Sequence, residues 1–283
     1  MSEFTQSEVE GCLIFLFRTT TMLSKSQISF INSLKQKKYR EEHQLFIAEG
    51  AKIVPELLNS SIVVKQVYAT SDFLRNNVIP STVERFEIKE NELERISGLT
   101  KANEVLAVCE TPNYVLDSES LKGKLTLVLD DIKDPGNLGT IIRIADWFGI
   151  ENIVCSSETV DAFNPKVVQA TMGSIARIKV HYINLIDFLK QQRTGVTLSG
   201  VEGKPKIYGA LLEGKNIYTE KLSSEGLIVI GNESRGISEE VQKLITDKIS
   251  IPSFSHYKSG GGEAESLNAA IATSIICSEF RRR

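Results

Sequence analysis

The stretch that decides the fold is Asp130-Asp131-Ile132-Lys133-Asp134-Pro135-Gly136-Asn137-Leu138-Gly139-Thr140-Ile141-Ile142-Arg143. It follows an apolar run, Leu125 to Leu129, which predicts a buried strand. The Asp, Pro and Gly residues predict a tight turn, and apolar residues at helical spacing then continue to Gly149. The polar loop between the end of a strand and the start of the next helix is a common ligand-binding place in α/β proteins.

The loop lacks both common phosphate-binding signatures. Gly136-Asn137-Leu138-Gly139 does not have the spacing of a dinucleotide-binding G-x-G-x-x-G, and the chain contains no Gly-Lys-Ser/Thr triplet. The sequence therefore argues against a nicotinamide enzyme and against a nucleotide hydrolase.

Composition indicates an ordinary globular protein. The 283 residues are 41% hydrophobic and 24% charged, enough for one large core or two modest ones. The net charge of -3 gives no whole-chain reason to expect nucleic acid, but basic residues gather early, at Lys35, Lys37, Lys38, Arg40 and Lys52. The four cysteines are widely spaced and histidines are few. We therefore expect reduced thiols, a cytoplasmic location, no metal site and, without a long apolar run, no membrane span.

Two regions of different texture divide the chain. Residues 1–23 are expected to be an N-terminal extension, and residues 1–21 are either an upstream over-extension of the start site or a genuine short tail that packs on a partner. Residues 24–109 predict a small α/β domain, and 110–123 are rich in turn residues and predict a linker. Residues 124–283 predict a parallel sheet covered on both faces, with strands at 125–130, 152–155, 177–181, 196–198, 227–231 and 248–251.

Two later segments complete the pattern. Leu227 to Ile230 predicts a buried strand, followed by the loop Gly231-Asn232-Glu233-Ser234-Arg235-Gly236 and a helix start at Ser238. Further on, Ile249-Ser250-Ile251-Pro252 predicts a strand end, and Ser266-Leu267-Asn268 opens a helix. Taken alone, that triplet is only a helix cap.

Together these three segments resemble motifs 1, 2 and 3 of the SpoU (TrmH-like) RNA ribose 2′-O-methyltransferases of the SPOUT superfamily. The resemblance implies an α/β fold whose C-terminal parallel sheet carries a trefoil knot. General topology rules would reject a threaded chain, so the knot rests on the resemblance alone. Residues 30–50 are similar to the substrate-binding domain of that family, which has a ribosomal-protein-L30-like fold and implies RNA contact by Lys37, Lys38 and Arg40.

The resemblance also assigns a site. It implies S-adenosylmethionine as cofactor and a catalytic set of Asn137, Arg143, Glu233, Ser266 and Asn268. Cofactor contacts are expected at Leu198, Ser199, Gly200, Gly231, Asn232, Gly236, Ile251 and Leu267. Because a guanidinium stays protonated in proteins, we favour Arg143 as a cation that binds phosphate and stabilises the forming alkoxide, over a general base.

The expected function is therefore 2′-O-ribose methylation of ribosomal or transfer RNA by a homodimer. Two alternatives stay open at this point. One is an RNA-binding protein that keeps the fold without turnover, which the five matching catalytic residue types disfavour. The other is a SPOUT methyltransferase that acts on a base nitrogen, which the Ser-Leu-Asn triplet and the Asn137/Arg143 pair disfavour.

Overall fold

The computed structural model describes residues 17–18, 22–194, 205–254 and 266–282. Contacts between residues divide the chain into two compact units. The first comprises Met1–Pro112 together with Phe163–Ala176, and the second comprises Asn113–Ala162 together with Arg177–Arg283. No described helix is long and apolar enough to cross a membrane.

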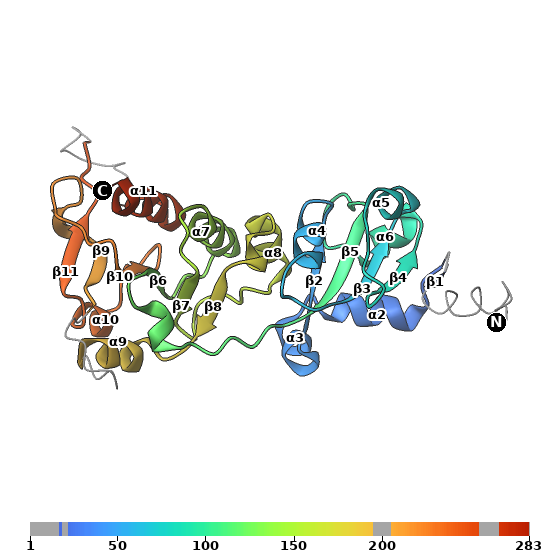
Figure 1. Ribbon diagram of the computed structural model, residues 1–283, viewed down its shortest axis with the longest axis horizontal. Helices are drawn as coiled ribbons and strands as arrows, with labels where there is room; N and C mark the ends of the chain where they lie inside the picture. Colours follow the sequence, from blue (N-terminus) through green and yellow to red (C-terminus); the bar gives the residue numbers. More distant parts are fainter. Residues whose placement is uncertain (1–16, 19–21, 195–204, 255–265, 283) are drawn as a thin grey trace, which may run out of the picture. The chain divides into compact units, whose positions relative to one another are not determined.

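The first unit is built on a mixed sheet (Figure 1). Its described strands are ordered β1-β4-β3-β5-β2; β5 runs antiparallel to β2 and β3, whereas β1, β3 and β4 are parallel. The elements are β1 (Phe17–Arg18), α2 (Lys25–Ser33), α3 (Lys37–His43), β2 (Leu45–Glu49), α4 (Ile53–Leu58), β3 (Val64–Ala69), α5 (Ser71–Asn76), β4 (Glu84–Glu87), α6 (Glu90–Ile96) and β5 (Val105–Glu110).

Both faces of this sheet are covered. Successive strand residues point to opposite faces, so the neighbours Phe46 and Ile47 of β2 enter different cores. Ile47 packs in a cluster with Ile31 and Leu34, whereas the ring of Phe46 meets that of Phe163, with centroids 4.8 Å apart. Helices on both faces explain why β2 and β5 are almost continuously buried and show no alternation.

Phe163 belongs to a segment that the sequence places in the second domain. Residues 163–176 hold α8 (Pro165–Thr171) and the 3-10 helix η2 (Ser174–Ala176), and their contacts assign them to the first unit. Val167 and Val168 are buried there. The contacts of residues 163–176 with the first unit were not expected from the sequence, because long-range packing leaves no mark on local periodicity.

The second unit contains a parallel sheet whose described strands are ordered β11-β9-β10-β6-β7-β8. Figure 1 shows α7 and α11 on one side of it and α9 and α10 on the other. The elements are the 3-10 helix η1 (Ser118–Leu121), β6 (Leu125–Asp130), α7 (Pro135–Trp147), β7 (Asn152–Cys155), β8 (Lys179–Tyr182), α9 (Leu185–Thr194), β9 (Ile207–Asn216), β10 (Gly226–Gly231), α10 (Glu239–Gln242), β11 (Asp247–Ser250) and α11 (Ala269–Arg282).

The central strands β6 and β10 are buried along nearly their whole length, as an apolar run in a parallel sheet predicts. Val128 and Val229 pack with Phe188 of α9 and Val241 of α10. The expected α/β class and parallel sheet are confirmed. The C-terminal region that would form the knot includes residues 255–265, which lie outside the described residues, so the knot stays a prediction.

The strand expected at 196–198 lies outside the described residues. The structure has a strand that the sequence did not predict, β9 at Ile207–Asn216, between β10 and β11. Glycines inside a strand weaken its sequence pattern. At Gly214 the glycine is required, because a Cβ there would lie 2.3 Å from the main-chain carbonyl carbon of Ile249.

Candidate active site

The candidate site lies at the carboxyl ends of β6 and β10, where α7 and α11 begin. Asp134 caps α7 by accepting a 2.8 Å hydrogen bond from the main-chain N–H of Asn137, and Pro135 follows in the first turn. Asn268 caps α11 by accepting from the N–H groups of Ala270 and Ile271. Two helix starts therefore present asparagine side chains at one edge of the sheet.

A chain of side-chain hydrogen bonds joins the three motifs. Asn268 Nδ2 donates to Asn137 Oδ1 at 2.8 Å, and Asn137 Nδ2 donates to Glu233 Oε1 at 2.6 Å. These residues are 131 and 96 positions apart in the sequence. Because both ends of the Asn137 amide are engaged, its orientation is fixed. We call this set the Asn268–Asn137–Glu233 chain; it brings together three of the five residues expected to be catalytic.

The other two expected catalytic residues lie outside this chain. Arg143 is exposed on α7, and no hydrogen bond or ion pair joins it to another residue in the described parts of the chain. Asp146, three residues further on, pairs instead with Arg177 at 2.8 Å. Ser266 is exposed just before α11. Arg143 is therefore a solvent-facing cation on α7, further along the same helix than Asn137.

The motif 2 loop turns back on itself tightly. Asn232 and Gly236 exchange two main-chain hydrogen bonds, of 3.0 and 2.9 Å, and Gly236 has φ +69°. A Cβ at Gly231 would lie 2.3 Å from the main chain of Gly236 and Ile237, so only glycine fits there. The cofactor contact expected at Gly231 and Gly236 stays a prediction.

Asn232 has a structural role in this loop. Its Oδ1 accepts from the main-chain N–H groups of Ser234 and Arg235, at 2.9 and 3.1 Å, and its Nδ2 donates to the Asp131 carbonyl at 2.8 Å. The side chain is therefore committed to shaping the loop. Any contribution of Asn232 to cofactor binding would come from its main chain.

The remaining expected cofactor contacts lie in different parts of the chain. Leu198, Ser199 and Gly200 lie outside the described residues. Ile251 is partly exposed after β11, and Leu267, directly before Asn268, leaves 47% of its surface exposed. Leu267 is therefore an exposed apolar side chain beside the Asn268–Asn137–Glu233 chain, and its contact with cofactor stays a prediction.

Sequence reasoning did not single out Asp130 or Asp131 as site residues. The buried Asp130 accepts from the N–H and Oγ of Ser238, at 2.8 and 2.7 Å, so Ser238 does not cap α10 with its side chain as its position suggested. Asp131 has φ +63° and contacts Lys133 and Arg235. The hydrogen bond from Lys133 to Asp131 raises the pKa of the lysine amine. The one sequence feature that could have indicated these two residues is the pair of adjacent aspartates after the apolar run Leu125 to Leu129.

The basic residues of the first unit separate into two kinds. Lys37 is exposed and pairs loosely with Glu41 at 3.6 Å, and Lys38 lies over the ring of Tyr39. Arg40 is buried, with 4% exposure, and its Nη1 donates to the carbonyls of Leu34 and Lys35 at 3.0 and 2.9 Å. This burial argues against the expected RNA contact at Arg40, because its guanidinium is already bonded to carbonyls at the end of α2.

A parallel α/β sheet with three polar loops converging at its carboxyl edge defines the class of ligand-binding α/β enzymes. No group of three or more metal-ligating side chains occurs among the described residues. A sequence model of the SpoU rRNA Methylase family matches residues 124–278, and the chain belongs to this family. A model of the MRM3-like substrate binding domain matches residues 25–107.

Individual relatives agree with this assignment. A solved structure described as a putative RNA methyltransferase of the TrmH family from Porphyromonas gingivalis is 40% identical, with a TM-score of 0.77 over 92% of this chain and 99% of that one. An AdoMet-bound rRNA methyltransferase from Sinorhizobium meliloti is 30% identical, with a TM-score of 0.77 over 94% and 97%. The 23S rRNA (guanosine(2553)-2′-O)-methyltransferase RlmP of Bacillus subtilis is 28% identical over 88% of this chain and 93% of its own length.

Proposed function

We propose that this protein transfers a methyl group from S-adenosylmethionine to a ribose 2′-hydroxyl of ribosomal RNA. The observation that carries the proposal is the Asn268–Asn137–Glu233 chain, which joins all three family motifs at one edge of the sheet. The names of the Bacillus subtilis and Sinorhizobium meliloti relatives support ribose 2′-O-methylation and AdoMet binding respectively. Ribosomal RNA is favoured over transfer RNA because both relatives act on it by name.

The residues present fit the proposed cofactor. Gly231 and Gly236 keep side chains out of the turn after β10, and the exposed Leu267 offers an apolar contact for an adenine ring. The bound cofactor would supply an electrophilic methyl group on its sulfonium. We assign its contacts to the main chain around Gly231, to Ile251 and to Leu267.

The protein's own contribution is alignment and charge. Methyl transfer is an in-line displacement, so the ribose oxygen has to be held on the line of the breaking bond. The Asn137 amide, fixed between Asn268 and Glu233, provides a rigid polar surface for that purpose. Arg143 supplies the cation that binds the neighbouring phosphate and stabilises the alkoxide as it forms. Ser266, exposed beside Asn268, completes the proposed set.

We also propose that the first unit captures the RNA and that the working enzyme is a homodimer. Lys37 and Lys38 support RNA capture, because both are exposed on the domain that matches a substrate-binding model. Exposed apolar side chains on α7 and α11 support the dimer: Trp147 is 84% exposed and Ile271 is 54% exposed. Sedimentation equilibrium should give twice the monomer mass, and Trp147→Glu should reduce it.

A reducing, cytoplasmic compartment is proposed from the thiols. Cys109, Cys155 and Cys277 are buried and free. Their reduced state suits a compartment in which disulfides are rare. Cell fractionation should recover the protein with cytoplasmic markers.

The activity is tested directly with methyl-labelled S-adenosylmethionine and ribosomal RNA. Nucleosides from the product should carry the label on a ribose 2′-oxygen. Label on a base nitrogen would favour the second alternative. Cofactor-independent RNA binding without any transfer would favour a protein that has lost turnover.

A further inference from the structure

Asp131 stands directly after β6 in an unusual backbone conformation. Its φ is +63°, in the left-handed region that most side chains avoid and that aspartate and asparagine tolerate better. Only 19% of its side chain is exposed. A residue held there needs surrounding contacts that fix it.

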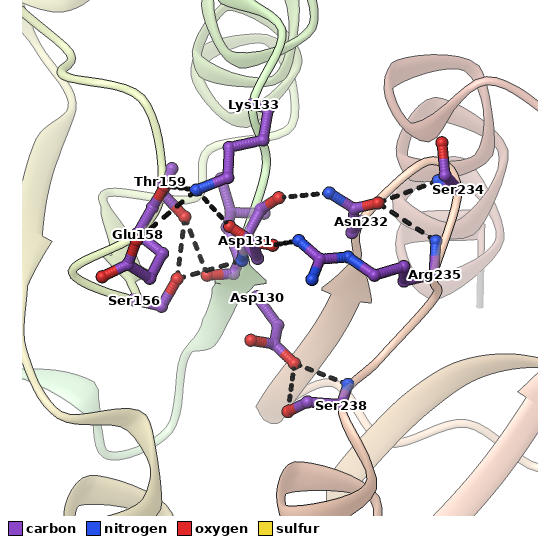
Figure 2. Close-up of polar contacts among 11 residues, drawn as sticks. Asp130, Asp131, Lys133, Ser156, Glu158, Thr159, Asn232, Ser234, Arg235 and Ser238 are labelled. Atoms are coloured by element: carbon purple, nitrogen blue, oxygen red, sulfur yellow. Dashed lines mark hydrogen bonds and ion pairs between the residues drawn. The ribbon is translucent and has the colours of Figure 1, made fainter.

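The main chain of Asp131 joins two neighbouring loops. Its N–H donates to Ser156 Oγ at 2.9 Å, in the loop after β7, and its carbonyl accepts from Asn232 Nδ2 at 2.8 Å, in the loop after β10. Because β6 lies between β7 and β10 in the sheet, Asp131 bridges the carboxyl ends of three adjacent strands (Figure 2).

The carboxylate of Asp131 extends the same bridge. Its Oδ1 lies 2.6 Å from Lys133 Nζ, and that amine also donates to the carbonyl of Glu158 at 2.6 Å. Its Oδ2 accepts from Arg235 Nη2 at 2.5 Å. Figure 2 shows the aspartate between the two cations. One anion thus holds two positive charges that would otherwise repel each other.

We propose that Asp131 is a positioning residue for methyl transfer, an inference that rests on the proposed function. Arg235 and Asn232 belong to the loop that carries Glu233, and Asp131 holds both of them. Fixing this loop sets the place where Glu233 accepts from Asn137. No hydrogen bond or ion pair among the described residues joins Asp131 to Glu233 or Asn137, so Asp131 acts through the loop.

The test compares Asp131→Gly and Asp131→Asn. Glycine adopts positive φ without strain, so Asp131→Gly removes the carboxylate and keeps the main-chain bridge. Asparagine also tolerates this conformation and keeps one side-chain oxygen. We expect kcat to fall about tenfold in Asp131→Gly, roughly the effect of losing one hydrogen bond to a charged group, and to fall less in Asp131→Asn. The KM for S-adenosylmethionine and the melting temperature should stay close to wild type.

Asp146→Asn is the matched control. Asp146 has a similarly shielded carboxylate, 23% exposed, that also pairs with an arginine, Arg177, but away from the motif loops. Its kcat should be unchanged. The double variant Asp131→Gly/Arg235→Gln should be no slower than Asp131→Gly alone, because both substitutions break the same ion pair.

The outcomes separate this inference from the proposed function. If wild type transfers no methyl group, the proposed function fails. An active wild type with unchanged kcat in Asp131→Gly overturns the positioning role alone, as does a loss shared equally by Asp146→Asn. Should Asp131→Gly not fold, Arg235→Gln breaks the same ion pair from an exposed side chain, 74% exposed, and must itself lower kcat. Normal kcat in Arg235→Gln would then contradict the role.

Discussion

Charged and polar side chains have different partners in the two units. In the first unit, buried ones satisfy the main chain: Arg40 donates to the carbonyls at the end of α2, Glu92 accepts from the N–H of Leu23, and Glu49 accepts from that of Gly98. At the sheet edge of the second unit, Asn137, Glu233 and Asn268 bind one another across three motifs.

This difference separates stability from chemistry. A buried group that satisfies main chain contributes to the stability of the fold and is shielded from a ligand. Side chains gathered from distant segments at a loop edge form a surface that presents them to a substrate. Arg40 and Arg143 are the same residue type, yet one is buried and engaged and the other is exposed. Substituting Arg40 should therefore lower the stability of the fold, whereas substituting Arg143 should lower the rate of methyl transfer.

The largest effect is expected for Arg143→Ala. Methyl transfer should fall by about 10²–10³, the usual effect of removing one electrostatic interaction in a transition state. Melting temperature and cofactor affinity should stay close to wild type, since the side chain is exposed. Single-turnover experiments with labelled cofactor measure the rate of methyl transfer.

Arg143→Lys then separates two roles. Lysine releases a proton more readily than arginine but forms no bidentate contact. Little recovery relative to alanine indicates a phosphate and alkoxide clamp, whereas recovery that grows at alkaline pH indicates a base. Full activity in Arg143→Ala would remove Arg143 from the site.

Arg40→Ala should act on stability. Removing the guanidinium leaves two carbonyls without their donor, at a cost of roughly 1–3 kcal/mol in the free energy of unfolding. Denaturant titration measures this cost, and RNA affinity at a temperature well below the melt should match wild type. Weaker RNA binding with unchanged stability would mean that Arg40 contacts RNA after all.

A smaller effect is expected from reversing charge at Lys37 and Lys38. In Lys37→Glu/Lys38→Glu, RNA binding should weaken, and its dependence on salt should flatten by about 0.7–0.9 in log–log slope for each phosphate that the variant no longer binds. The matched control is Lys89→Glu/Lys101→Glu, which makes the same change in net charge at two exposed lysines of the same unit outside the basic stretch. An equal change in the control would show that the effect comes from the net charge of the protein and not from contacts of Lys37 and Lys38 with RNA.

The smallest effect concerns pH. Burial lowers the pKa of His181, whose ring lies beside Tyr114 and Asn152. The unfolded chain therefore binds a proton more readily, so this histidine destabilises the fold as pH falls below about 6.5. As the pH is lowered from 7.5 to 5, the melting temperature should drop more in wild type than in His181→Phe. Parallel curves would show that His181 does not contribute.

Local patterns predicted the parts of the structure that local chemistry controls. The strand at 125–130 and the helix after Pro135 follow from an apolar run, a cap and a proline. The meeting of Asn137, Glu233 and Asn268 was predicted only through the resemblance, because no spacing reveals contacts 96 and 131 residues apart.

Three features were beyond local patterns, each for a physical reason. Burial of Arg40 depends on where α2 ends relative to α3, and an exposed and a buried arginine look alike in a charged stretch. Strand β9 contains glycines that close packing requires but that weaken a strand pattern. The left-handed backbone at Asp131 is fixed by partners in the loops that follow two other strands.

The central claim is that the Asn268–Asn137–Glu233 chain is the site of ribose methylation. The most direct test is mass spectrometry of nucleosides from ribosomal RNA incubated with S-adenosylmethionine and either wild type, Asn137→Ala or the exposed control Asn59→Ala. Wild type and Asn59→Ala should produce a 2′-O-methylated nucleoside, and folded, cofactor-binding Asn137→Ala should produce none. Undiminished 2′-O-methylation by Asn137→Ala, or a base-methylated product from wild type, would contradict the claim.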